Sequence, residues 1–530
     1  MREFGPKIEL GDLGLDHAPL VRAGVVDISP PSLRDNTGLA DRLARTAARA
    51  WGLAEVSVPP GLAPRLVEWH RRGVTGIWAA CAVEERRGRV VAVEAGPGPG
   101  GCFGLAVDVG STTLALALVD LEKPRIMDQL DLINPQVKYG PDILTRVHLA
   151  DKAEWFERLC RELLDAVNQG LAELCRRNAL EPGQVTAGVV AGNTAMTHFL
   201  LRLPVGTLIR EPYVPVLNRP EGLTAGEIGL DLSPLAPVLV LPNKGAYFGG
   251  DLLAGLVVAG LARAEEPCLL VDVGTNAEVV LGQKDWLIGA AGAAGPALEG
   301  GVAAMGVAAG PGAVDWVRID RRTGQVRWRT IDGGRPRGLC GSGLIDLFAE
   351  LFLSGLIDFR GRLTLPRGHE RRVETDEGPA FVVAPGQETE SGRPLTLSEV
   401  ELDLLIRSKA AMYTILSTVL ASVGLEFGQV QRFYMAGTFG QFLDPRMAVA
   451  VGMVPDIPLE RYVSLGNSSL KGAVLTLVST GARAEVLEVW RRLTYLEMNV
   501  NQDLMNRFSA ARFIPHTERS LFPSVGTIIK

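Results

Sequence analysis

A duplicated stretch constrains the fold of this 530-residue chain more than any other feature of its sequence. Residues 105–118, LAVDVGSTTLALAL, are echoed by residues 269–281, LLVDVGTNAEVVL. Each copy holds an apolar run, Asp-Val-Gly, a hydroxyl residue and a second apolar run, which predicts a strand, a tight turn and a returning strand. Asp272 follows Asp108 by 164 residues, about one domain length, so the repeat predicts two similar domains.

The two turns have the chemistry of a phosphate and magnesium site. A glycine at 110 and at 274 can adopt positive φ and lets the backbone approach a ligand, and successive backbone N–H groups there form an anion-binding nest. Asp108 and Asp272 are expected to be the catalytic carboxylates and to hold Mg²⁺ mostly through water. Such a turn can also do no more than close a hairpin, but its duplication favours phosphate binding. The predicted phosphate contacts are Gly110, Ser111, Thr112, Thr113, Gly274, Thr275 and Asn276.

Further glycine-rich turns could complete a nucleotide site, because ligands of α/β proteins bind at the ends of strands. Residues 435–440, MAGTFG, would leave room for a purine or ribose. Residues 338–343 and 192–194 open predicted helices, whose N–H groups can face an anion, although each can also be a plain helix cap. The contacts predicted from these turns and from residues 466–469 are Asn193, Gly341, Ser342, Gly437, Thr438, Gly440 and Asn467.

The composition changes near residues 96–101, GPGPGG, which predicts a flexible linker. Before it we expect a small α/β domain for docking or dimerisation, with a helix through residues 33–50 that is interrupted by a turn at residues 36–38, and strands at 55–58 and 89–93. After it, apolar strands alternate with amphipathic helices, which is typical of α/β proteins. The expected elements there are helices at 152–178, 251–264, 398–423 and 484–507, a strand at 187–191, and a hairpin with an exposed loop within 358–394.

Composition argues against several classes of protein. A net charge of −6 disfavours a nucleic-acid binder. The chain starts without a signal-like apolar stretch, and its longest uncharged helical run, residues 410–425, is shorter than the roughly 20 residues of a membrane span. The six cysteines and six histidines are scattered without the spacing of a metal site. We therefore expect a cytoplasmic protein with reduced thiols and no membrane or nucleic-acid partner.

These motifs resemble those of the acetate/sugar kinase, heat-shock chaperone and actin superfamily. The twin turns look like its two phosphate motifs, and MAGTFG looks like its adenosine motif. More narrowly, the chain resembles the ATP-dependent reductive activators of corrinoid proteins over nearly its whole length. The matching segments are residues 30–35 (PPSLRD), 134–136 (NPQ), 139–140 (YG), 192–197 (GNTAMT), 249–251 (GGD), 295–297 (GPA), 340–343 (CGSG), 466–470 (GNSSL), 513–516 (FIPH) and 522–525 (FPSV).

The resemblance implies an α/β fold of duplicated actin-like, ribonuclease H-like ATPase halves around a nucleotide cleft. It assigns residues 1–100 to a small α/β middle domain with its linker, 101–265 to half I, and 266–530 to half II with C-terminal helices and a tail. It also implies ATP and Mg²⁺ as cofactors and a corrinoid protein of a methyltransferase system as partner, whose cobalt is reduced from Co(II) to Co(I) with the support of ATP hydrolysis.

One departure from the family concerns electron transfer. Its members usually begin with a ferredoxin-like domain whose four cysteines hold a [2Fe–2S] cluster, whereas the first hundred residues here contain only Cys81. We therefore expect electrons to come from a separate donor or from a domain that has been removed. Two other functions stay open: a small-molecule kinase of the same superfamily, and a non-enzymatic nucleotide-dependent scaffold. A homodimer formed through the first domain is a further expectation.

Overall fold

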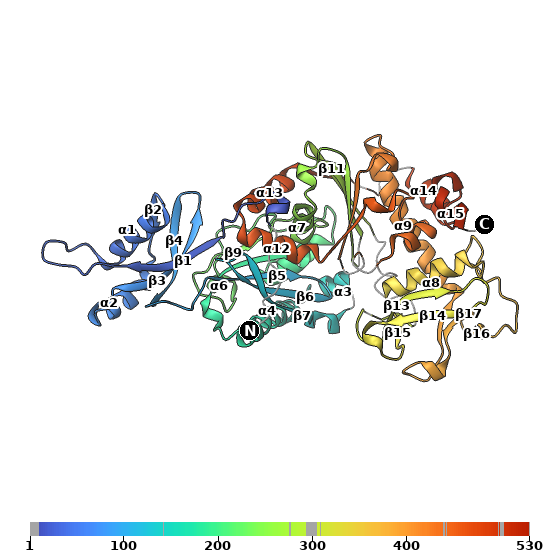
Figure 1. Ribbon diagram of the computed structural model, residues 1–530, viewed down its shortest axis with the longest axis horizontal. Coiled ribbons are helices and arrows are strands. Elements are labelled where there is room, and N and C mark those ends of the chain that lie inside the picture. Colours follow the sequence, from blue (N-terminus) through green and yellow to red (C-terminus); the bar gives the residue numbers. More distant parts are fainter. Residues whose placement is uncertain are drawn as a thin grey trace. The chain divides into compact units, whose positions relative to one another are not determined.

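The computed structural model describes residues 10–140, 142–274, 277–292, 305–307, 309–437, 440, 443–496, 498 and 503–528 (Figure 1). Contacts between residues divide the chain into two compact units. Unit 1 comprises Met1–Val258 and Ser468–Arg491, and unit 2 comprises Ala259–Asn467 and Arg492–Lys530. Each unit is described by itself below.

Unit 1 begins with a small domain of four strands in the order β1-β3-β4-β2 and two helices. Its elements are β1 (Val21–Asp27), α1 (Leu39–Trp51), β2 (Glu55–Ser57), α2 (Ala63–Arg71), β3 (Gly76–Glu84) and β4 (Arg87–Ala95). The two predicted strands are therefore confirmed as β2 and β4. The helix begins at Leu39, directly after the turn predicted at residues 36–38, and no helix forms over residues 33–35 before that turn. Arg42 holds the preceding loop in a non-helical form by donating to the carbonyls of Asp35 and Thr37.

One glycine of the glycine- and proline-rich segment after β4 lies closely against the first domain. Gly98 has a φ of 69°, and a Cβ at this position would lie 2.2 Å from Cγ of Trp78. Trp78 is buried in a cluster that also includes Cys102 and residues of the next sheet. Glycine at 98 therefore allows the chain to pass closely over an indole ring, whereas a Cβ at Gly96 or Gly100 would meet nothing within 4 Å. The flexibility of this linker stays a prediction.

The two main sheets share one topology, which confirms the duplication. In unit 1 the order is β7-β6-β5-β8-β9, and in unit 2 it is β12-β11-β10-β19-β20 with β21 added beside β12. In each unit the first three strands are antiparallel neighbours, and the fourth and fifth run parallel to the first. The strands of unit 1 are β5 (Phe103–Val109), β6 (Thr113–Asp120), β7 (Arg125–Ile133), β8 (Val185–Gly192) and β9 (Val238–Val240). Those of unit 2 are β10 (Cys268–Val273), β11 (Ala277–Gln283), β12 (Trp286–Gly292), β19 (Arg432–Ala436), β20 (Tyr462–Gly466) and β21 (Leu493–Tyr495).

Apolar helices cover the sheet of unit 1. They are α3 (Ile143–Leu149), α4 (Ala153–Arg177), α5 (Thr194–Leu200), α6 (Ala225–Ile228), α7 (Gly250–Ala259), α12 (Ser468–Val478) and α13 (Thr480–Arg492). The helices α12 and α13 follow β20 of unit 2 but count with unit 1, because α12 lies against β5 and β8 and contacts α7 through Gly472. Half II was predicted to span residues 266–530, but the contacts assign Ser468–Arg491 of this span to unit 1.

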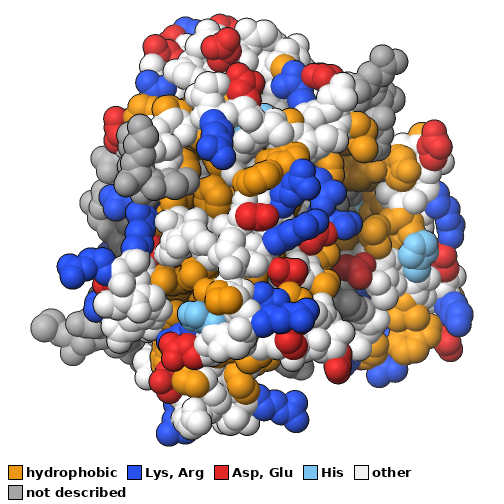
Figure 2. All heavy atoms as spheres, turned by 90° about the vertical axis from the view of Figure 1, so that its right-hand side faces the viewer, with side chains coloured by type: hydrophobic (Ala, Val, Ile, Leu, Met, Phe, Trp, Pro, Cys, Tyr) orange, Lys and Arg blue, Asp and Glu red, His pale blue; other side chains and the backbone are white. Residues whose placement is uncertain are grey.

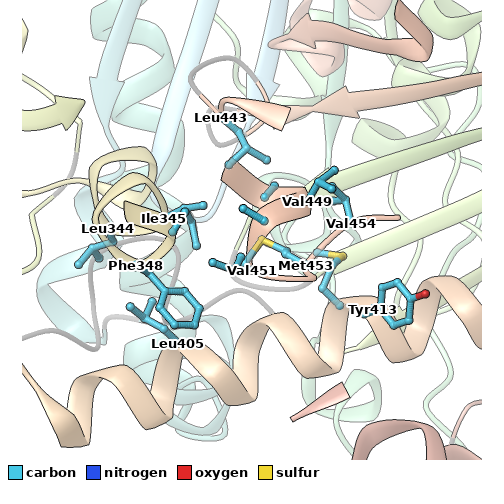
Figure 3. Close-up of a cluster of buried hydrophobic side chains, with 14 of the residues drawn as sticks. Leu344, Ile345, Phe348, Leu405, Tyr413, Leu443, Val449, Val451, Met453 and Val454 are labelled. Carbon is cyan, nitrogen blue, oxygen red and sulfur yellow. The ribbon is translucent and has the colours of Figure 1, made fainter. Parts of the chain in front are cut away.

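Unit 2 carries two small sheets and a helical core. The sheets are β14-β13-β15 and β16-β17-β18, the second including the predicted hairpin. Their strands are β13 (Ala313–Ile319), β14 (Val326–Thr330), β15 (Gly338–Leu339), β16 (Arg372–Thr375), β17 (Gly378–Ala384) and β18 (Leu395–Ser398). The helices are α8 (Gly341–Leu353), α9 (Glu399–Ser422), α11 (Pro445–Ala450), α14 (Leu504–Ala511) and α15 (Pro523–Ile528). Figure 3 shows Phe348 of α8, Leu405 of α9 and Val449 of α11 in one buried apolar cluster.

Two features of these helices bear on the predictions. The helix predicted for residues 484–507 is wrong, because α13 ends at Arg492 and the next three residues pair with β12 as strand β21 before α14 begins. Among the described residues, one helix, α9, is long and apolar enough by composition to cross a membrane. The same helix is a core element of unit 2, with 67% of its most apolar window buried.

Candidate functional site

The first predicted turn joins β5 to β6 in unit 1. Asp108 stands at the end of β5, in register with Ala191 of β8, and its Oδ1 accepts a hydrogen bond of 2.7 Å from Oγ of Ser469. The N–H of Gly110 donates to the carbonyl of Thr113 at 3.1 Å and closes the turn. A Cβ at Gly110 would lie 2.5 Å from that carbonyl oxygen, so glycine is required by close approach and not by a positive φ.

Two further backbone segments meet this turn. A Cβ at Gly192, the last residue of β8, would lie 2.8 Å from the carbonyl oxygen of Val109. A Cβ at Gly249 would lie 2.4 Å from Cα of Asn193. The Asn193 side chain caps α5 by accepting from the N–H of Met196 at 2.9 Å. The ends of β5 and β8 and the residues before α7 thus meet in close backbone contact, with no room for side chains at Gly192 and Gly249.

The second predicted turn lies in unit 2 and repeats this arrangement. Asp272 is the second-to-last residue of β10 and stands in register with Ala436 of β19. Gly437 follows with a φ of 78°, and a Cβ there would lie 2.8 Å from Oδ1 of Asp272 and 3.1 Å from the carbonyl oxygen of Val273. The Ala-Gly pairs that end β8 and β19 are therefore a second duplicated feature, and each glycine packs against the Asp-bearing strand beside it.

Of the other predicted nucleotide contacts, the structure describes some residues and not others. A Cβ at Gly440 would lie 2.7 Å from the backbone of Met435, so these two residues of the MAGTFG segment approach closely. Ser342, in the first turn of α8, is buried, with its Oγ 3.3 Å from Sγ of Cys340. The part of Gly341 and Ser342 in a nucleotide site stays a prediction. The same holds for Asn467, which follows β20. Thr275, Asn276 and Thr438 lie outside the described residues.

The donor set suits a hydrated magnesium ion. Across the described ranges, no group of three or more His, Cys, Asp and Glu side chains could hold a metal ion. One carboxylate beside a phosphate turn matches Mg²⁺, which keeps several waters and takes few protein ligands. The six cysteines are buried and unpaired, and burial raises the pKa of the Cys81 and Cys102 thiols to about 12. The cysteines of the described chain therefore offer no cluster of thiolates for a [2Fe–2S] group.

Three residues at the first turn were not among the predicted contacts. Ser469 bonds Asp108, whereas the sequence pointed to the neighbouring Asn467 of the same segment. Asn134 and Arg146 both donate to carbonyls of the turn. Asn134 had a signal, since it belongs to the NPQ segment that resembles the family, but a single arginine within a short helix gave none.

Two family models match the chain. The model described as the C-terminal domain of RACo, the ASKHA domain, matches residues 266–526, and the model described as the RACo middle region matches residues 103–264. The RACo middle region therefore corresponds to residues 103–264, which hold the main sheet of unit 1. The resemblance had assigned the term middle domain to residues 1–100. The ASKHA match and the repeated sheet confirm the actin-like α/β fold.

Three individual proteins resemble between about half of the chain and nearly all of it. A solved structure of a reductive activator for corrinoid, iron–sulfur protein is 35% identical, covers 96% of this chain and 81% of its own, and superposes with a TM-score of 0.88. The corrinoid activation enzyme RamQ of Eubacterium limosum is 26% identical over 404 residues, which are 75% of this chain and 68% of that protein. The Co(II) methylated amine-specific corrinoid protein reductase of Methanosarcina barkeri is 26% identical over 277 residues, 48% of this chain and 47% of its own.

Proposed function

This chain belongs to the RACo family of reductive activators, and we propose that it activates a corrinoid protein by supporting the ATP-dependent reduction of its cobalt from Co(II) to Co(I). The observation that carries the nucleotide part is the repeated geometry of Asp108 and Asp272. Each carboxylate ends the first strand of its sheet beside a glycine that ends or follows the neighbouring parallel strand. Such strand ends are where α/β proteins bind phosphate ligands.

The proposed site assigns a role to each group of residues. Asp108 and Asp272 hold the waters of Mg²⁺, and their turns, including Gly110, Ser111, Thr112, Thr113, Gly274, Thr275 and Asn276, contact the phosphates. The adenosine lies against Gly437, Thr438 and Gly440, and the site is completed by Asn193, Gly341, Ser342 and Asn467. Magnesium supplies charge neutralisation of the phosphates during hydrolysis of ATP to ADP and phosphate.

The reduction of the cobalt also needs an electron donor. Reduction of Co(II) to Co(I) consumes one electron, and the described residues hold no cluster of cysteines that could carry it. We infer that the electron comes from a low-potential iron–sulfur carrier, which is either a separate protein or a domain removed from this one. ATP binding and hydrolysis bias the activator toward the conformation that promotes this transfer, which requires a different affinity of ATP for the two conformations.

ATP turnover measured with and without a Co(II) corrinoid protein tests this function. We expect the corrinoid protein to stimulate turnover, and Asp108→Asn or Asp272→Asn to lower it at least about 100-fold, a typical cost of removing one electrostatic contact to a transition state. Asp285→Asn, in the exposed turn between β11 and β12, is the matched control. Unchanged turnover on adding Co(II) corrinoid protein would count against the proposal, and phosphate transfer to a metabolite would instead favour a kinase.

Assembly and location are part of the same proposal. The first domain presents a fully exposed Leu33 on a loop whose base is tied by Arg42, so it suits a docking or dimer contact. On the face shown in Figure 2, acidic and basic side chains are interspersed with apolar ones, without the basic stripe of a nucleic-acid binder. We place the protein in the cytoplasm, where its thiols stay reduced.

A further inference from the structure

The turn after Asp108 is held from outside by two residues. Its three carbonyls each accept a hydrogen bond. Gly110 O accepts from Nδ2 of Asn134 at 2.8 Å, Ser111 O from Nη1 of Arg146 at 2.5 Å, and Thr112 O from the backbone N–H of Asn134 at 2.9 Å. The hydrogen bond from Gly110 N–H to Thr113 O already closes this turn. The three further hydrogen bonds are therefore not needed to form the turn, and they indicate that its orientation matters.

Both donor side chains are completely buried. Asn134 and Arg146 have 0% of their surface exposed. Nε of Arg146 donates to Gly140 O at 2.8 Å, and Oδ1 of Asn134 accepts from the N–H of Gln136 at 3.0 Å. Burying a guanidinium costs free energy, and this burial lowers the pKa of Arg146. The carboxylate of Asp142 partly opposes this fall in pKa, and the guanidinium stays a cation behind the turn.

The bracing determines the direction of the N–H groups in the turn. In a planar trans peptide the C=O and N–H point in opposite directions. When the carbonyls of Gly110 and Ser111 are drawn toward Asn134 and Arg146, the N–H groups of Ser111 and Thr112 are directed away from them. Within the described part of the chain, neither N–H has a hydrogen-bond acceptor. Two adjacent N–H groups of this kind form a nest for an anion.

We propose that Asn134 and Arg146 are positioning residues that preorganise this turn for a nucleotide phosphate. Asn134 fixes the turn at both ends, and Arg146 fixes its centre and adds positive potential behind the N–H groups. Neither residue touches the nucleotide. The inference rests on the proposed function, since it concerns the turn that holds the phosphates there. Fixed donors need no reorganisation when the ligand arrives, so their benefit is specific to the phosphate part of the ligand.

Comparing the affinities of Mg·ATP and adenosine tests this role, because adenosine lacks the phosphates. Asn134→Asp keeps the bond accepted from Gln136 and loses the bond donated to Gly110 O. Arg146→Lys keeps the positive charge but loses the guanidinium group, which donates to the carbonyls of both Gly140 and Ser111. We expect each variant to weaken Mg·ATP binding about tenfold or more, with adenosine affinity unchanged within about twofold and a circular dichroism spectrum like that of the parent protein.

Asn168→Asp is the matched control. Asn168 also donates to a carbonyl, that of Gly229 at 2.9 Å, and accepts from the backbone N–H of Asp231 at 3.0 Å. It lies in α4, however, and its hydrogen bonds are at the surface and do not involve the turn after Asp108. We expect this variant to bind both ligands like the parent protein. An equal loss of ATP and adenosine affinity in Asn134→Asp and Arg146→Lys, or no loss of either, would overturn the proposal. Failure of the parent protein to bind ATP would instead refute the proposed function.

Discussion

Gly437 has both a backbone conformation and surroundings that exclude a larger residue. Its φ of 78° is strained for any side chain, and a Cβ would lie 2.8 Å from Oδ1 of Asp272. We expect Gly437→Ala to lower the free energy of unfolding by about 1–3 kcal/mol and to weaken nucleotide binding. Gly424→Ala is the control, because Gly424 has a φ of 70° with nothing within 4 Å of its Cβ. Equal loss of nucleotide affinity in both variants would show that contact with Asp272 is unimportant.

Asp346 predicts a pH dependence of stability. Burial raises its pKa to about 6 from an ordinary 3.8, although Arg318 lies 2.6 Å away and partly opposes the rise. Between these two values the folded chain binds more protons at this site than the unfolded chain does. The contribution of Asp346 to the free energy of unfolding therefore falls as the pH rises from about 4 to about 6.

Urea denaturation at several pH values checks this sign. The stability difference between the parent protein and Asp346→Asn is expected to change across about pH 4–6 and to be constant above that range. Asp285→Asn, which removes an exposed carboxylate from the turn between β11 and β12, is the control for the loss of one acidic group. A constant difference for Asp346→Asn from about pH 4 to 7 would contradict the raised pKa.

Individual site residues differ in how far sequence could predict them. Asp108, Gly110 and Asp272 belong to the duplicated segment, so the repeat itself revealed them. Ser469 contacts Asp108 across 361 positions of the chain, and Arg146 reaches Ser111 across 35. Such contacts depend on how helices pack on the sheet, and a single sequence contains no period or spacing that reports them.

Among the elements, α12 connects packing to the site. A Cβ at Gly472 would lie 2.5 Å from the carbonyl oxygen of Ala254 in α7, so the two helices meet without a side chain between them. Gly472→Ala would push α12 from α7 and displace Ser469 from Asp108. We expect it to lower the midpoint of thermal unfolding, at a cost of about 1–3 kcal/mol, and to weaken Mg·ATP binding.

Gly183→Ala is the control for this helix contact, because a Cβ at Gly183 in unit 1 meets nothing within 4 Å. It should leave both the unfolding midpoint and the affinity close to those of the parent protein. Parent-like unfolding of Gly472→Ala would show that α12 and α7 can separate at little cost.

Element predictions succeeded where a segment was long and regular. The helices α4 and α9 and the strands of the duplicated turn follow clear apolar periods and were predicted closely. The predicted helix over residues 484–507 failed because Leu493–Tyr495 gains partners in β12, a pairing that local propensity does not reveal. In the first domain β1 and β3, which pair with each other, were not predicted.

At the scale of the whole molecule, the repeat predicted two similar sheets, and the shared strand order confirms them. The boundary between the two units was harder to predict from the sequence. The chain leaves unit 2 after Asn467, contributes α12 and α13 to unit 1, and returns at Arg492. A sequence read from end to end assigns such a segment to its neighbours in the chain, because its partners in space are far away in sequence, as Ala254 is from Gly472.

The formation of Co(I) tests the central claim most directly. A Co(II) corrinoid protein, a low-potential one-electron donor and this protein are mixed, and Co(I) absorbance is followed with and without Mg·ATP. We expect Co(I) to accumulate only when protein, donor and ATP are all present, and to fail with Asp108→Asn or Asp272→Asn. Co(I) formation at the same rate without ATP, or ATP turnover without any Co(I), would contradict the account.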